Sequence, residues 1–197
     1  EETGRLDNTL IIFLSDNGAC AEDIPDNVTV EELVNDLMIA RSHTRKGEEV
    51  IFGNIPDIMP GPENTYQSYG TAWANLSNTP FRLYKHWTHE GGVSTPLIMH
   101  WPSGIKKPGE IRHSPGQLPD IMATIIDITQ AEYPKEYQGN AILPLEGRSL
   151  MPLFTADNLE PRPLFWEHEG NAAVRFGKWK LVREYPGPLE LYDMEQD

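Results

Sequence analysis

The sequence of 197 residues predicts an α/β fold, namely the C-terminal part of a mixed sheet with helices, followed by a small antiparallel C-terminal subdomain. Three features support this fold class. Residues 9–14 form a continuous apolar run, residues 118–129 repeat apolar side chains at helical spacing, and residues 164–193 contain four short strand-like pieces separated by glycine-bearing turns. We therefore expect two regions, residues 1–160 and residues 161–197.

The first apolar run, residues 9–14, predicts a strand that ends at the turn sequence SDNG, residues 15–18. A run that is apolar on both faces is typical of the interior of a parallel sheet, where neighbouring strands and crossover helices cover it. Few candidates for those partners follow in the sequence. We therefore expect the chain to be a piece of a larger protein.

The remaining elements follow in order. Residues 30–46 carry apolar side chains at helical spacing and predict a short helix, with Glu31 and Glu32 in its first turn. Residues 53–80, rich in Gly, Pro, Asn and Ser, predict a long loop. Residues 93–101 predict a second sheet strand, and residues 118–129 predict a helix with Pro119 in its first turn.

The composition excludes several function classes. The formal net charge of −14 argues against a nucleic-acid-binding surface, which needs clustered Lys and Arg to contact phosphates. The longest apolar run is far too short to span a membrane. The single cysteine, Cys20, excludes an internal disulfide.

Asp16 and Asn17 at the end of the first strand are candidate metal ligands. A carboxylate beside an amide oxygen offers hard oxygen ligands, which Ca²⁺ or Mg²⁺ prefers. Two ligands do not complete a site, because Ca²⁺ usually takes about six to eight oxygens. The alternative is that Asp-Asn-Gly here is simply a turn sequence.

Lys85 is the second candidate, because an ammonium is a compact charge suited to the oxygens of a sulfate or phosphate group. The alternative is a solvated surface lysine. His89 lies four residues further on, close enough to share the site or to serve a structural role. His168, in the stretch FWEHEGN, is either a donor to a sulfate or sugar oxygen or an exposed loop histidine. For Arg82 we expect a structural ion pair.

Residues 10–18 (LIIFLSDNG) and 78–96 (NTPFRLYKHWTHEGGVSTP) together resemble the C-terminal part of the type I sulfatases, which are arylsulfatase-like members of the alkaline phosphatase superfamily. The resemblance continues through residues 96–102, 179–182 and 190–193. It implies an alkaline-phosphatase-like fold and hydrolysis of aryl or carbohydrate sulfates. It also implies that Asp16 and Asn17 bind Ca²⁺, with Mg²⁺ as the lesser alternative, that Lys85 contacts the sulfate ester, and that His168 and His89 lie on the substrate side.

The resemblance also implies a formylglycine nucleophile, made from the cysteine or serine of a CxPSR-type motif. Cys20 is not that residue, because it is followed by AEDI, without a proline two positions on or an arginine four positions on. We expect the nucleophile in a missing N-terminal part of the same protein, and no activity from this chain alone. The family resemblance suggests a periplasmic, secreted or lysosomal location, and a sulfated small molecule or glycan as partner.

Two alternatives stay open at this point. One is a phosphate- or phosphonate-ester hydrolase of the same superfamily, although the Asp-Asn pair differs from zinc sites rich in His and Asp. The other is a non-catalytic carbohydrate-binding module, which the five tryptophans favour.

Overall fold

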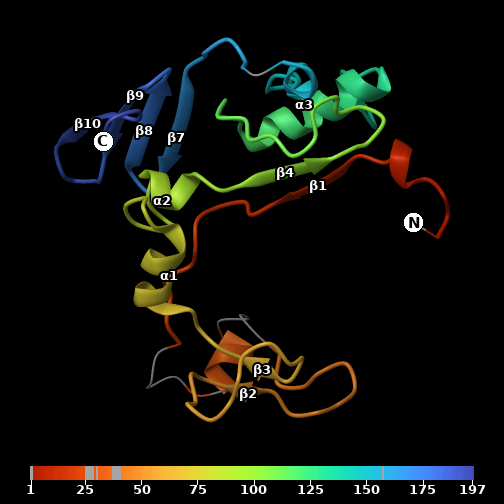
Figure 1. Ribbon diagram of the computed structural model, residues 1–197. Coiled ribbons are helices and arrows are strands. Elements are labelled where there is room, and N and C mark those ends of the chain that lie inside the picture. Colours follow the sequence, from red (N-terminus) through yellow and green to blue (C-terminus); the bar gives the residue numbers. More distant parts are fainter. Residues whose placement is uncertain (1, 25–28, 30, 37–40, 157) are drawn as a thin grey trace. The chain divides into compact units, whose positions relative to one another are not determined.

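The computed structural model describes residues 2–24, 29, 31–36, 41–156 and 158–197 (Figure 1). They form two compact units. Unit 1 comprises residues 1–16 and 95–197, and unit 2 comprises residues 17–94. Among the described residues, none of the helices has the length and apolar character that crossing a membrane requires. The expected boundary near residue 160 stays a prediction.

The two sheet strands expected around residues 9–14 and 93–101 are confirmed in unit 1 as β1 (Ile11–Leu14) and β4 (Leu97–His100), which lie side by side in Figure 1. They pair antiparallel, with Ile11 opposite His100 and Leu14 opposite Leu97. β4 is thus an antiparallel neighbour of β1, and the expectation that β1 belongs to the interior of a parallel sheet stays a prediction. An apolar run indicates burial but carries no information on strand direction. In this chain Phe13 of β1 is 67% exposed.

Helix α3 (Leu118–Thr129) has the bounds that the sequence predicts. Gln117 and Asp120 form a reciprocal capping box at its N-terminus, Pro119 occupies the first turn, and Gln130 ends the helix in the left-handed conformation. These are the features that start and stop helices, since they satisfy the unpaired backbone groups of the end turns. The local sequence and the apolar periodicity therefore agree.

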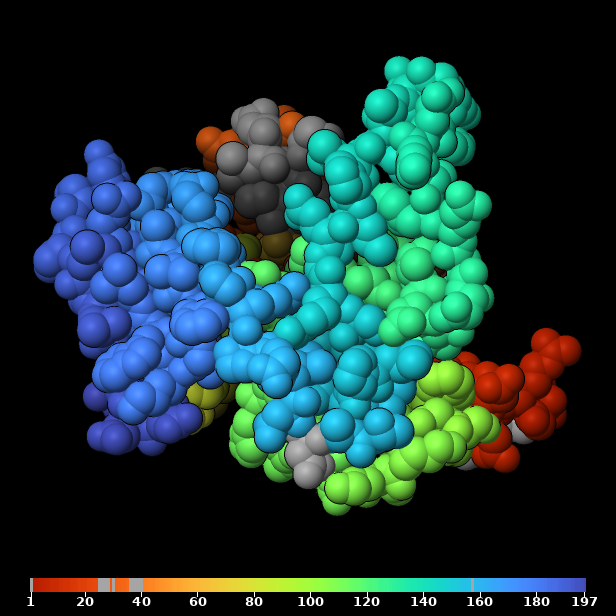
Figure 2. Space-filling model, turned by 90° about the horizontal axis from the view of Figure 1, so that it is seen from above, coloured from red at the N-terminus to blue at the C-terminus, as the bar shows by residue number. Residues whose placement is uncertain are grey.

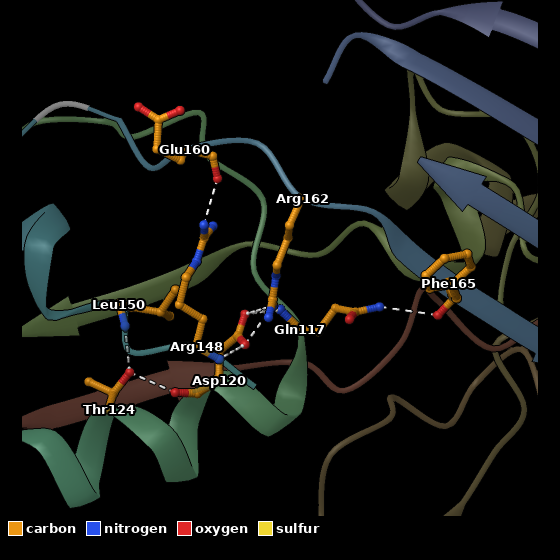
Figure 3. A network of polar contacts seen from close by, with 8 residues as sticks. All are labelled: Gln117, Asp120, Thr124, Arg148, Leu150, Glu160, Arg162 and Phe165. Carbon is orange, nitrogen blue, oxygen red and sulfur yellow. Dashed lines mark hydrogen bonds and ion pairs between the residues drawn. The ribbon is translucent and has the colours of Figure 1, made fainter. Parts of the chain in front are cut away.

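The first turn of α3 is also the centre of a buried polar network (Figure 3). The Asp120 carboxylate, 1% exposed, accepts hydrogen bonds from the backbone N–H groups of Gln117 (2.8 Å) and Arg148 (2.7 Å). Its two oxygens also accept from Nη2 of Arg162, at 2.5 and 2.6 Å. Every contact comes from within unit 1. The buried charge is therefore both paired and hydrogen-bonded, as burial requires.

The network ties α3 to the segment that leads into the C-terminal sheet. Thr124, which is fully buried, donates to the Asp120 carbonyl (2.6 Å) and accepts from the Leu150 N–H (2.8 Å). Gln117 Nε2 donates to the carbonyl of Phe165 in β7 (3.1 Å). Figure 2 shows residues 145–156 (cyan) between the C-terminal sheet (blue) and the α3 region (green).

The four strands expected after residue 163 are confirmed as β7 (Leu164–His168), β8 (Asn171–Phe176), β9 (Trp179–Arg183) and β10 (Leu189–Asp193). They form one antiparallel sheet in the order β10-β9-β8-β7. The register places Trp166, Ala173 and Val182 in one row. Lys180 lies on the same face and is 1% exposed, with Nζ 5.1 Å from the Trp166 ring centroid.

Short elements complete unit 1. They are two 3-10 helices, Leu6–Asn8 and Met151–Phe154, and the hairpin of β5 (Glu136–Tyr137) and β6 (Asn140–Ala141). Leu150 and Phe154 are buried near α3, and Leu164 is buried where β7 begins. These apolar side chains form the part of the core that joins α3 to the C-terminal sheet.

Unit 2 departs from the sequence expectation in two places. The helix expected over residues 30–46 is described as helical only at its start, with a π-helix at Glu32–Asp36. Positions 30 and 37–40 lie outside the described residues, and residues 41–46 are not helical. There the Val50 N–H donates to the Ser42 carbonyl, and the backbones of His43 and Glu49 form an isolated antiparallel β-bridge. Gly47, at φ +84°, closes this turn, which explains why the helical pattern does not continue.

The second departure lies in residues 53–80, which were expected to be a loop. They contain helix α1 (Gly70–Asn78), which buries Ala74 completely. The parallel pair of β2 (Ile51–Phe52) and β3 (Thr65–Tyr66) precedes it, and α2 (Glu90–Val93) follows. The prediction failed because glycine and asparagine stand at the two ends of α1, where they favour helix termini, while alanines occupy its middle.

Candidate functional site

The site begins where β1 runs into the Asp-Asn-Gly turn. Gly18, the buried last residue of this turn, donates its N–H to the Gly92 carbonyl of α2 (2.9 Å). A Cβ added at Gly18 would lie 1.7 Å from the Gly91 carbonyl oxygen, so only glycine fits. Two segments far apart in the sequence therefore touch backbone to backbone. The tight turn that the sequence predicts at Glu90-Gly91-Gly92 is the short helix α2.

Asn78, the last residue of α1, joins the turn to the lysine loop. Its Oδ1 accepts from the Ala19 N–H (3.1 Å), and its Nδ2 donates to the Leu83 carbonyl (2.9 Å). An amide has both a donor and an acceptor, so one side chain satisfies both segments. Sequence reasoning missed this role. The sequence signal available was an asparagine at the start of the stretch that resembles the sulfatases.

Lys85 is held beside the same turn by its backbone. Its N–H donates to the Ala19 carbonyl (3.0 Å), directly across from the Asn78 contact. The loop around it includes two residues other than glycine with positive φ, Leu83 at 68° and His86 at 94°. Such conformations are costly and cluster at functional sites. Lys85 therefore lies in a constrained loop and not on an ordinary surface segment.

The Lys85 ammonium pairs with a residue that the sequence did not suggest. Its Nζ lies 3.3 Å from Oε1 of Glu22, with 42% of the lysine side chain and 78% of the glutamate side chain exposed. A hydrogen bond from Cys20 and the nearby Lys85 ammonium hold the pKa of the Glu22 carboxyl below its ordinary value. The two residues are 63 positions apart, so no local pattern could reveal the pair.

The two histidines assigned to the substrate side have different surroundings. His89 is 3% exposed and directly precedes α2, a position that favours the structural alternative. His168 is exposed at the end of β7 in unit 1, opposite Asn171 across the turn formed by Glu169 and Gly170. A role in substrate binding stays a prediction for both. So does the ion pair of Arg82, whose carbonyl accepts from the Gly91 N–H (2.9 Å).

Asp16 and Asn17 stand in sequence at the carboxyl end of β1, where Asp16 is exposed and Asn17 is half-buried. Ligands of open α/β sheets gather at this end of the strands. The donor set fits a hard cation, since a carboxylate and an amide oxygen suit Ca²⁺ or Mg²⁺ and not a thiolate-bound metal. Cys20 is a half-buried free cysteine, and its side chain contacts the Glu22 carboxylate.

Comparison with known proteins gives consistent results. Residues 1–131 match the family described as Sulfatase, and residues 81–197 match the family described as N-sulphoglucosamine sulphohydrolase, C-terminal. An uncharacterized sulfatase of Schizosaccharomyces pombe is 30% identical over 98% of this chain and 34% of its own length. An arylsulfatase of Klebsiella aerogenes is 30% identical over 79% of this chain and 30% of its own length.

Solved structures agree on the fold. The structure of Ps i-CgsB in complex with k-i-k-neocarrahexaose superposes with a TM-score of 0.61 at 21% identity, covering all of this chain and 32% of that one. The chain therefore has the mixed α/β fold of the corresponding part of that structure. The chain belongs to the sulfatase family, and it matches the C-terminal portion of its relatives. It spans about a third of the length of these relatives.

Proposed function

We propose that this chain supplies one side of the active site of an enzyme that hydrolyses sulfate esters. In the intact protein, Asp16 and Asn17 hold a Ca²⁺ ion and Lys85 contacts the sulfate group of the substrate. The formylglycine nucleophile lies outside this chain. The observation that carries the proposal is the pair of contacts at Ala19, which hold the Lys85 loop and Asn78 against the residues directly after the metal turn.

Each proposed residue suits its role. Ca²⁺, when bound, supplies positive charge that polarises the sulfate oxygens. The Lys85 ammonium adds a second positive charge, which stabilises the negative charge that grows on the ester oxygen as the bond breaks. The contact between the Lys85 N–H and the Ala19 carbonyl fixes the backbone from which this side chain extends. His168 is a further candidate donor to the substrate.

The names of the relatives support two substrate classes. One relative is an arylsulfatase, and another, from Sus scrofa, is an N-acetylgalactosamine-6-sulfatase that is 31% identical over 53% of this chain and 19% of its own length. We therefore propose aryl or carbohydrate sulfates as substrates of the intact enzyme. The first assay substrate is 4-nitrophenyl sulfate, whose product is coloured, and sulfated sugars follow.

The test is a set of variants in the intact protein. We expect Lys85→Ala to lower kcat by about 10²- to 10³-fold, the effect of removing one electrostatic stabiliser of a transition state. Lys85→Arg should restore little activity, because a planar guanidinium does not fit a position built for a compact charge. Lys46→Ala is the matched control, since Lys46 is an exposed lysine of the same unit. We expect it to behave as the wild type.

A second readout addresses the metal. Asp16→Ala should lower the calcium content of the purified intact protein, measured by elemental analysis, whereas Lys85→Ala should leave it unchanged. The isolated 197-residue chain should release no phenol above background. Three results would contradict the proposal. They are an unchanged kcat/KM in a correctly folded Lys85→Ala enzyme, an unchanged metal content in Asp16→Ala, and turnover by the chain alone.

A further inference from the structure

The carboxylate of Glu22 contacts the Lys85 ammonium, the group that contacts the substrate sulfate in the proposed function. The Nζ to Oε1 distance is 3.3 Å. The backbone fixes this encounter, because the Lys85 N–H donates to the carbonyl of Ala19, three residues before Glu22. Cys20, between them, also contacts the Glu22 carboxylate. The backbone contact therefore brings the segment that carries Glu22 next to Lys85.

We propose that Glu22 is a specificity-determining residue, which lowers the net positive charge at Lys85 and so favours singly charged sulfate monoesters over doubly charged phosphate monoesters. This inference rests on the proposed function of Lys85. Glu22 acts through Lys85 and through its own charge, without a role in the bond-breaking step.

The argument is electrostatic. A sulfate monoester carries one negative charge, whereas a phosphate monoester carries close to two above its second pKa of about 6. An anion bound at Lys85 must approach the Glu22 carboxylate, which lies 3.3 Å from Nζ. The repulsion grows in proportion to the charge of the anion, so Glu22 disfavours a dianion about twice as strongly, in free energy, as a monoanion. Glu22 therefore makes the site discriminate between anions by their charge.

The solvent exposure of the pair determines how strongly Glu22 affects anion binding. With 78% of the glutamate side chain exposed, water screens the interaction, and exposed pairs of this kind contribute up to about 1 kcal/mol, which corresponds to roughly a fivefold change in an equilibrium constant. Removing the negative charge should therefore strengthen binding of a sulfate monoester by up to about fivefold. It should strengthen binding of a phosphate monoester by about the square of that factor.

The experiment uses the intact protein with 4-nitrophenyl sulfate as substrate and 4-nitrophenyl phosphate as competitive inhibitor, at low ionic strength and about pH 8, where the phosphate is doubly charged. Glu22→Gln should lower the inhibition constant of the phosphate by a larger factor than it lowers the KM of the sulfate. The ratio of the two constants should shift about three- to fivefold toward phosphate. Added salt should reduce this shift.

Two variants separate charge from structure. Glu22→Asp keeps the negative charge and should stay near the wild-type ratio. Glu48→Gln removes a charge from another exposed glutamate of unit 2 and should leave the ratio unchanged. An unchanged ratio in Glu22→Gln, or the same ratio in Glu22→Asp and Glu22→Gln, would overturn the inference while Lys85→Ala still lowers activity. A wild-type protein without sulfate turnover would instead overturn the proposed function and this inference together.

Discussion

Asp120 and Glu22 each pair with a cation, and the surroundings of these two carboxylates differ in almost every respect. Asp120, in unit 1, is 1% exposed and receives two backbone N–H groups in addition to Arg162. Glu22, in unit 2, has a side chain that is 78% exposed and meets Lys85 at 3.3 Å. One carboxylate is enclosed by donors on all sides. The other is open to water and to any anion that approaches.

This difference separates a structural pair from the pair to which we assign a functional role in our proposal. A buried charge that loses its partner stays buried and uncompensated, so such a pair must remain intact for the fold to persist. An exposed pair contributes little to stability, and its cation can exchange one anion for another at small cost. A residue meant to meet an anionic substrate belongs in the second kind of setting. Lys85 is in that setting and Arg162 is not.

The largest effect is expected from breaking the buried pair. Asp120→Ala leaves the Arg162 guanidinium without its carboxylate and two N–H groups without an acceptor, which should lower the free energy of unfolding by about 3–5 kcal/mol. Urea denaturation measures the loss. Hydrogen exchange should also accelerate at the amides of Gln117 and Arg148, which donate to Asp120. Glu132→Ala, at an exposed position just beyond α3, is the control, and equal losses in both variants would refute the comparison.

An intermediate effect is expected where the site is held by backbone and not by side chains. A Cβ at Gly91 would lie 2.0 Å from the Leu83 carbonyl oxygen, so Gly91→Ala forces the lysine loop away from α2. Overpacking of this kind costs about 1–3 kcal/mol, measured by urea denaturation. Gly116→Ala, whose Cβ finds its nearest neighbour at 3.4 Å, should be tolerated. A Gly91→Ala protein with wild-type stability and activity would mean that this close approach does not position Lys85.

The smallest effect is expected from the exposed pair. Glu22→Gln should change the free energy of unfolding by less than about 1 kcal/mol at about pH 7. Its folded-state pKa is lowered, so any stabilisation is present above the ordinary pKa and disappears as the pH falls through the folded value. The stabilities of the wild type and Glu22→Gln, measured by urea denaturation, should therefore converge as the pH falls below the ordinary pKa of the carboxyl. A loss as large as that of Asp120→Ala would remove the distinction between the two pairs.

The sequence predicts those parts of the molecule whose information is local. The apolar periodicity and the caps of α3 lie within a few residues of one another, and the C-terminal strands alternate and end at glycine turns. Both were predicted correctly. Helix α1 was missed because its terminal glycine and asparagine resemble loop residues, and the helical pattern after residue 40 failed because a turn at Gly47 took its place.

In the candidate site, too, the sequence does not reveal contacts between residues that are far apart along the chain. Asp16, Asn17 and Lys85 were proposed as site residues with the help of a family resemblance, whereas Glu22 was not, because its proposed role comes from a contact with a residue 63 positions away. Asp120 has no signal in the sequence beyond its place in the first turn of α3. Its pairing with Arg162, 42 positions further on, depends on the tertiary fold. Neither pairing leaves a pattern that can be read along the chain.

The antiparallel pairing of β1 and β4 has a consequence for how this protein can vary. Leu14 stands opposite Leu97, and the Thr95 hydroxyl donates to the Ser15 carbonyl (2.7 Å), so the chain leaves and re-enters unit 1 at neighbouring points. Everything between those points is, topologically, an insertion. The entropic cost of closing a loop grows only with the logarithm of its length. Insertions whose two ends lie close together are therefore well tolerated. Related proteins can therefore have a longer, shorter or different segment in place of residues 41–66. The register between β1 and β4, which positions Asp16, would stay the same.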